Sequence, residues 1–185
     1  MRFSLSILIL LLLPGAIMAH GVDGHPFVAG LTHPIFGIDH LLAIVGITLI
    51  GHHLMDEKPW LPSILFIIAM AIGGFLGSTA DPINITELVI QASVIICGII
   101  IWGQLRLTLV GFALLGIIFG FFHGHAHGTE MPIDSPIHIY IIGYVLGATL
   151  LSLVGYLIAK LFTSGLGIRT LGAFIAGMGT AMLLV

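Results

Sequence analysis

Six apolar stretches, each close to the length of a membrane span, follow one another along the chain and constrain its fold more than any other feature. In helical conformation, about 20 apolar residues cross the ~30 Å of hydrocarbon in a bilayer. The chain is 58% hydrophobic and only 7% charged, which leaves too little polar surface for a water-soluble domain. We therefore predict an all-α integral membrane protein, a compact bundle of six transmembrane helices after an N-terminal signal peptide. The predicted spans are residues 34–52, 61–80, 84–105, 108–126, 137–159 and 166–185.

Residues 1–19 have the pattern of a secretory signal peptide. Arg2 gives a positive start, and an apolar core over residues 5–13 precedes a small-residue cleavage site that ends at Ala19. The core is short for a membrane span, which favours cleavage; the alternative is an uncleaved first transmembrane helix. With cleavage, residues 20–185 form a single transmembrane domain of six helices.

The basic residues indicate the orientation of the spans. With the mature N-terminus outside, alternation through six spans places every Lys and Arg of the mature chain on one side, as the positive-inside rule requires. An uncleaved first helix would keep this orientation. We expect a multi-pass protein of the inner (cytoplasmic) membrane, surrounded by the lipid bilayer, with a periplasmic N-terminus. The basic residues are Lys58, Arg106, Lys160 and Arg169.

The first of two histidine clusters lies where the first span begins, and it contains His33, Asp39 and His40. Pro34 suits the first position of a helix, so we expect His33 at the mouth of the span. On one straight helix, His40 would follow two turns later on nearly the same face. A carboxylate such as Asp39 is costly in an apolar segment unless it is paired or bound to a metal. The alternative is a purely structural Asp–His pair.

The second cluster, at the end of the fourth span, has three histidines within five residues. His123 and His127 are four residues apart and share a helix face, and Glu130 continues that face if the helix persists. Two imidazoles and a carboxylate are a suitable ligand set for a borderline divalent metal. His125 points to the opposite side, where it would be a gate, a second site or an interface residue.

Other residues are weaker candidates. His20, which would carry the α-amine of the mature chain, and the nearby His25 are candidate accessory metal ligands. Glu87 follows Asn84 by three residues, which is typical of a capped helix start; a role in the outer vestibule is the alternative. Cys97 lies in an apolar run and predicts a buried core residue rather than thiolate metal chemistry.

Glycine pairs spaced by four residues recur along the spans and predict close helix packing in lipid. Gly124 and Gly128 alternate with the histidines of the second cluster. For these two, the alternative is a loosened helix that exposes carbonyl groups to a passing ion.

Together, the two clusters resemble the signatures of a known membrane family. The motif H-x5-D-H at His33–His40 is similar to the first signature of the HupE/UreJ family, and F-H-G-x-A-H-G-x-E at Phe122–Glu130 to the second. The resemblance implies a nickel permease, or in some members a cobalt permease, that supplies hydrogenase or urease maturation, with cytoplasmic metallochaperones as partners. By this resemblance, the metal residues are His33, Asp39, His40, His123, His127 and Glu130.

We expect a secondary transporter (permease) that imports a divalent transition metal, Ni²⁺ or Co²⁺, from the periplasm to the cytoplasm. The sequence does not exclude Zn²⁺ as the transported ion. The sequence has no Gly-x4-Gly-Lys-Ser/Thr phosphate loop, so an ion gradient or trapping of the ion has to drive uptake. We expect no catalytic residues, no permanently bound cofactor and no nucleic-acid partner. The sequence leaves open whether the protein forms a homo-oligomer. The alternative is an intramembrane metalloenzyme that holds a catalytic metal on the same residues.

Overall fold

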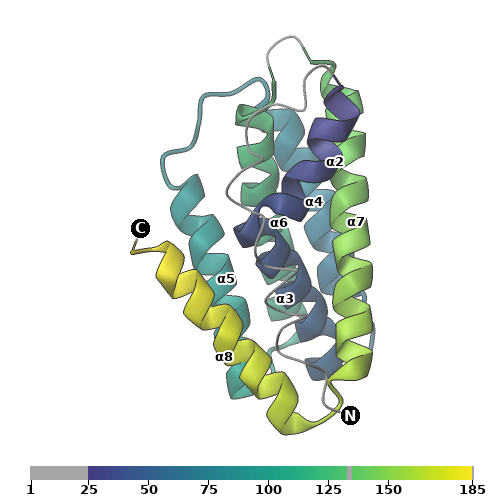
Figure 1. The fold of residues 1–185 in the computed structure, drawn as a ribbon, viewed down its shortest axis with the longest axis vertical. Helices are drawn as coiled ribbons and strands as arrows, with labels where there is room; N and C mark the ends of the chain where they lie inside the picture. Colours follow the sequence, from purple (N-terminus) through teal and green to yellow (C-terminus); the bar gives the residue numbers. More distant parts are fainter. Residues whose placement is uncertain (1–24, 133–134, 185) are drawn as a thin grey trace.

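The computed structural model describes residues 25–132 and 135–184, and every regular element in these segments is an α-helix (Figure 1). The all-α prediction is thus confirmed for the described residues. The predicted signal peptide, residues 1–19, and His20 lie outside them. The helices are α2 (Pro26–Phe36), α3 (Ile38–Leu54), α4 (Leu61–Gly77), α5 (Thr86–Gly103), α6 (Leu109–Thr129), α7 (Ile137–Leu161) and α8 (Gly165–Met182). Each of the last five predicted stretches corresponds to one of these helices.

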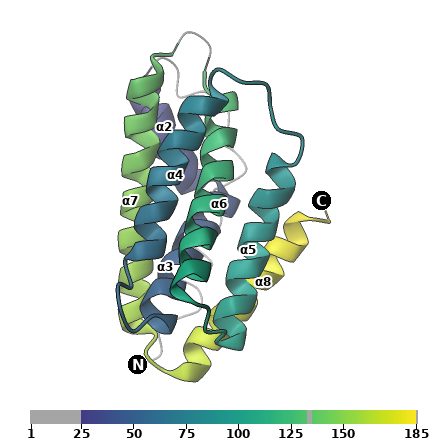
Figure 2. The same ribbon diagram turned by 180° about the vertical axis from the view of Figure 1, so that it is seen from behind.

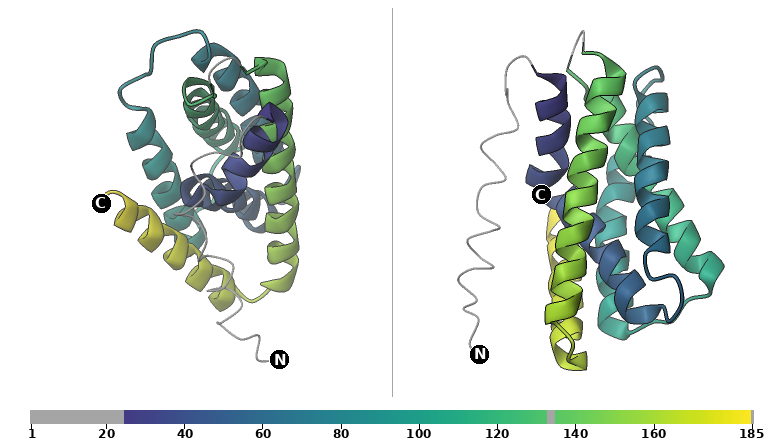
Figure 3. Two further views of the ribbon diagram at one scale, coloured as in Figure 1. Left: turned by 45° about the horizontal axis from the view of Figure 1, so that its top comes forward. Right: turned by 90° about the vertical axis from the view of Figure 1, so that its right-hand side faces the viewer.

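Helix α3 forms the centre of the bundle. Residues 42–51 of α3 are all buried, and α7, α5 and α4 pack around this helix. The other helices associate in pairs, α4 with α6, α2 with α7 and α5 with α8. Figure 2 shows α4 beside α6, and the side view in Figure 3 shows α2 lying along α7. This arrangement brings α2, α3 and α6 together, although α6 is remote from the other two in sequence.

The helices have the length and surface of membrane spans. Among the described residues, α5, α6 and α7 are each long and apolar enough to cross a membrane, and α2 and α3 qualify together as one bent span. Large apolar side chains also face outward; Val110 is 66% exposed and Leu157 52% exposed. Helices that are apolar on their outer as well as their inner faces are typical of a lipid environment. These features are those of a helical membrane protein.

The expectation of one straight first span over 34–52 is wrong. The chain becomes helical well before Pro34, which lies inside α2 rather than at a helix start. Gly37 then takes an extended conformation (φ −72°, ψ 109°) between α2 and α3. Proline lacks the amide hydrogen that a helix interior needs, and glycine has a low helix propensity, so both residues favour a break. The chain bends by 71° here, which places His33 and His40 on two different helices.

Glycines bring α4 and α6 into close contact. A Cβ atom on Gly73 or Gly77 of α4 would collide with the backbone of α6. One on Gly124 or Gly128 of α6 would collide with the backbone of α4. Since α6 stays helical through Gly124 and Gly128, close packing is their role, and the alternative of a loosened helix is wrong.

Candidate metal site where three helices meet

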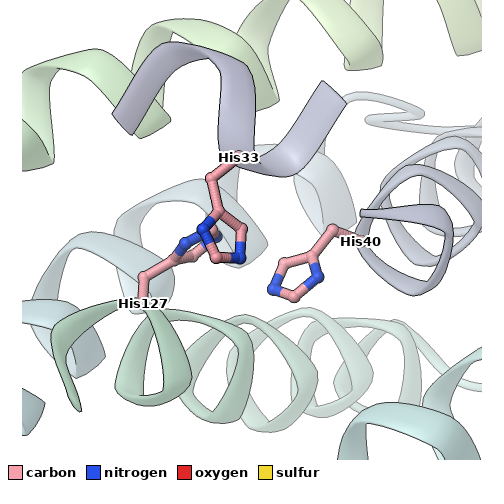
Figure 4. Close-up of side chains that lie close together, drawn as sticks. All are labelled: His33, His40 and His127. Atoms are coloured by element: carbon pink, nitrogen blue, oxygen red, sulfur yellow. The ribbon is translucent and has the colours of Figure 1, made fainter. Parts of the chain in front are cut away.

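Three imidazole rings meet at the break between α2 and α3. His33 lies in the last turn of α2, His40 in the first turn of α3 and His127 in the last turn of α6. One nitrogen atom from each ring lies within 4.8 Å of the other two, and the rings point toward one another (Figure 4). The structure therefore brings the two predicted clusters together. Neutral imidazoles at such distances are suitable ligands for a divalent transition metal.

The break at Gly37 allows His33 and His40 to face each other. Their ring centroids are 5.5 Å apart, with an interplanar angle of 68°. A Cβ atom on Gly37 would lie 3.1 Å from both Asp39 Oδ1 and His40 Nδ1, so a side chain at this position would push against the pair. The two histidines are neighbours as predicted, but because of the bend and not because they share a face of one helix.

The carboxylate of Asp39 orients His40. Its Oδ1 accepts a hydrogen bond from His40 Nδ1 at 2.7 Å and another from the His40 main-chain nitrogen at 2.8 Å. With Nδ1 as the donor, the lone pair of His40 Nε2 is free, and this atom is buried with no hydrogen-bond partner among the described residues. A carboxylate on the second nitrogen of a ligand histidine is common at metal sites. Asp39 thus lies beside the three-histidine group rather than within it.

His123 lies one turn further into the bundle along α6. Its side chain is fully buried, and its ring centroid is 4.8 Å from that of His40 and 5.2 Å from that of Phe66. His123 Nδ1 donates a hydrogen bond to the carbonyl oxygen of Phe119 at 2.8 Å, which leaves the lone pair of Nε2 free. We call His33, His40, His123 and His127 the histidine cluster.

His127 is enclosed on all sides. Its side chain has no exposed surface, and within the part of the chain that the structure describes neither ring nitrogen has a hydrogen-bond partner. Its ring stacks on Tyr144 of α7 instead. A buried polar atom without a partner costs about 1–3 kcal/mol. The free nitrogens of His40, His123 and His127 therefore mark a place where a bound cation would be stabilising.

Glu130 reaches the histidine cluster through His33. Helix α6 ends just before Glu130, so the face of His127 does not continue to this residue as the sequence suggested. The Oε2 atom of Glu130 lies 3.4 Å from His33 Nε2, and the Glu130 side chain is 48% exposed. Partial burial raises the pKa of this carboxyl above its usual value, and the nearby charge of Glu87 adds to the rise.

The accessory candidates that the structure describes lie apart from the histidine cluster. His25 is exposed just before α2, and Glu87 is exposed in the first turn of α5, where the described residues provide no side-chain cap. His125 is buried between α4 and α6, 6.2 Å from the ring of Phe121. Of the three roles considered for His125, this position supports that of an interface residue. His20 is not among the described residues.

Two tyrosines of α7 complete the wall of the cluster, and sequence reasoning missed both. Tyr144 stacks on His127, and Tyr140 lies edge-on to the same ring with its centroid 6.5 Å away. Their spacing of four residues on an aliphatic helix is the only signal that the sequence offers. Nothing in that spacing shows that α7 adjoins the last turn of α6.

The chain is similar to known proteins along nearly its whole length. The family described as HupE / UreJ protein matches residues 8–182. Protein HupE of Rhizobium leguminosarum bv. viciae is 31% identical over 177 residues, which cover 94% of this chain and 93% of that protein. No solved structure matches.

These matches decide between the two classes of function that the sequence left open. The family is one of transporters and not of enzymes, so the alternative of an intramembrane metalloenzyme is wrong. The chain belongs to the HupE/UreJ family, which is associated with nickel and cobalt uptake in hydrogenase and urease systems.

Proposed function

We propose that the protein is a secondary transporter that imports Ni²⁺ or Co²⁺ from the periplasm into the cytoplasm. The observation that carries this proposal is the meeting of three imidazoles, with ligand atoms within 4.8 Å of one another, inside an apolar bundle. Family membership supports the same cargo. Imidazole and carboxylate suit borderline divalent cations, whereas the softest metal ions prefer thiolates.

We further propose six spans, with α2 and α3 counted as one bent span. The α3–α4, α5–α6 and α7–α8 connections then share one side, which is the lower end in Figure 1. An ion pair between Arg106 Nη1 and Asp56 Oδ2, at 2.8 Å, joins two of these connections. Because basic residues favour the cytoplasmic side, the opposite end, where α6 ends at Glu130, would face the periplasm. The lower end carries all Lys and Arg residues of the described segments, which are Lys58, Arg106, Lys160 and Arg169.

The histidine cluster offers an incoming cation a series of positions. His33 and the adjoining Glu130 are the most exposed residues at the cluster, with 33% and 48% of their side-chain surface accessible, and they would receive the ion first. His40 and His127 would bind it next, His40 through its free Nε2. His123, fully buried one turn further along α6, would follow. Neutral imidazoles can replace the ion's water and still release it, as conduction requires.

Initial rates of radioactive nickel uptake into proteoliposomes test this proposal. We expect His40→Ala and His127→Ala each to lower the rate at least about tenfold, since the loss of a mere orienting partner already costs 10–100-fold in metal affinity. His138→Ala is the matched control, because His138 is exposed at the start of α7 and lies outside the cluster. Equal uptake by the control and by both cluster variants would overturn the proposal.

The same vesicles identify the preferred ion. The ligand set alone does not choose between nickel, cobalt and zinc. Competition by Co²⁺ and by Zn²⁺ against radioactive Ni²⁺ ranks the three directly. Stronger competition by Zn²⁺ than by Co²⁺ would contradict the proposed cargo.

A further inference from the structure

His127 lacks the hydrogen bond that orients the other buried members of the histidine cluster. Asp39 holds His40, and the carbonyl of Phe119 holds His123. Neither nitrogen of His127 has a partner in the described segments. A ligand histidine is usually held through its second nitrogen, which fixes the orientation of the ring. A different interaction must therefore fix the ring of His127.

Tyr144 supplies a contact suited to this task. The centroids of the Tyr144 and His127 rings are 4.8 Å apart, and their planes differ by only 7°. The contacts of His127 with the histidine rings beside it are tilted or edge-on instead. A parallel neighbour of this size confines the imidazole to one plane while it leaves both nitrogen atoms free.

Tyr144 is itself held firmly. It is fully buried, its hydroxyl donates a hydrogen bond to the carbonyl oxygen of Met70 on α4 at 3.3 Å, and Tyr140 packs edge-on against it with ring centroids 5.6 Å apart. Gly74 of α4 makes room for the hydroxyl, because a Cβ atom there would collide with the Tyr144 oxygen and lie 2.8 Å from its Cζ. A rigid ring can impose its orientation on a neighbour, whereas a mobile one cannot.

We propose that Tyr144 is a positioning residue of the metal site, whose ring holds the imidazole of His127 in the plane in which it faces His33 and His40. This inference rests on the proposed function, because it assigns Tyr144 a part in metal binding by the same cluster. Tyr144 acts through His127 and not on the ion itself. Its aromatic ring carries the effect, and its hydroxyl only anchors the ring to α4.

Binding of Co²⁺ to the purified full-length protein in detergent tests the inference, because the visible spectrum of bound Co²⁺ reports the number and geometry of its ligands. Tyr144→Leu removes the stack; we expect at least about tenfold weaker binding and an altered spectrum. Tyr144→Phe keeps the ring and should retain both affinity and spectrum. Tyr156→Leu is the matched control, since Tyr156 lies on the same helix and contacts the ring of His52, a histidine outside the cluster.

A second pair of variants changes Gly74 on α4, which contacts the Tyr144 hydroxyl. This pair tests the positioning role even if Tyr144→Leu does not fold. Gly74→Ala displaces the tyrosine and should weaken Co²⁺ binding. Combining Gly74→Ala with Tyr144→Phe removes the colliding oxygen and should recover part of the lost affinity. An unaffected Gly74→Ala variant, or a double variant without any recovery, overturns the positioning role.

The inference and the proposed function fail in different ways. Equal Co²⁺ binding by the wild type and His127→Ala would overturn the metal site itself, and the inference with it. If His127→Ala loses binding while Tyr144→Leu keeps the wild-type affinity and spectrum, only the positioning role is overturned. The same holds if Tyr156→Leu is impaired as strongly as Tyr144→Leu.

Discussion

Asp39 acts on the histidine cluster through His40. Its carboxylate oxygen accepts from both the ring and the main chain of His40, so it fixes which nitrogen of that ring carries the proton. A charged acceptor makes a hydrogen bond about twice as strong as a neutral one. It also increases the basicity of the imidazole, which would strengthen a bond from His40 to a metal. The charge of Asp39, more than its shape, is therefore what the site uses.

The variant Asp39→Asn separates charge from shape. The amide oxygen can still accept from His40 Nδ1, but the negative charge is lost, so we expect Ni²⁺ affinity to fall 10–100-fold. Calorimetric titration of the purified protein measures the affinity. Asp56→Asn serves as the control, because Asp56 forms an exposed ion pair away from the cluster and such pairs contribute about 0–1 kcal/mol. If the two variants bind Ni²⁺ alike, the orienting role of Asp39 is wrong.

The break between α2 and α3 is the element-level feature that creates the site. A single straight helix would set His33 and His40 two turns apart along its axis. The 71° bend instead turns the end of α2 and the start of α3 toward the last turn of α6. Irregular backbone inside a membrane is tolerated where protein surrounds it or where it lines a polar cavity. Here α7 packs against both α2 and α3.

Gly37→Ala tests how closely the break fits the site. The added Cβ would lie 3.1 Å from both the Asp39 carboxylate and the His40 ring, so one or both have to move, and we expect at least about tenfold weaker Ni²⁺ binding. Gly177→Ala in α8 is the matched control, because nothing lies within 4 Å of the added atom. The control should bind normally and unfold at the same or a higher temperature, since alanine favours a helix by about 1 kcal/mol over glycine. Unchanged binding by Gly37→Ala would show that the break has room to adapt.

Apolar runs of nearly span length were sufficient to predict most of the helices, because hydrophobicity and short polar connections are local properties. The run 137–159, for example, became α7 with the same start. The break at Gly37 was missed because a bend leaves no trace in the apolar pattern. The four-residue spacing placed His123 and His127 on one face correctly. The contact between His127 and Tyr144 could not be predicted, because it depends on which helices are neighbours.

For the whole molecule, the main organising feature is that the basic residues lie far from the histidine cluster. The basic residues of the described segments lie at one end of the bundle, and the cluster opens at the other end through Glu130. In a membrane, the positive end stays on the side where the chain is made. In the orientation that we propose, the exposed carboxylate of Glu130 would meet cations that arrive from the periplasm.

Cysteine labelling of intact cells tests this orientation. In a Cys97→Ala background, which removes the single native thiol, His138→Cys should react with a membrane-impermeant maleimide from the periplasmic side. Lys58→Cys should react only after the cells are opened, because Lys58 lies at the positive end. Both positions are exposed, so accessibility across the membrane, not burial, decides the result. The reverse pattern would invert the proposed topology and the direction of transport with it.

His33, His40 and His127 belong to three helices, so an ion gripped by all of them would tie those helices together. Any movement that frees the ion has to pull them apart, and every bond to the ion then adds to the barrier against its departure. A cation that binds imidazole too tightly would block the transporter rather than pass through it. Copper(II), which has the highest affinity in the order of the first-row divalent metals, would therefore inhibit transport instead of being transported.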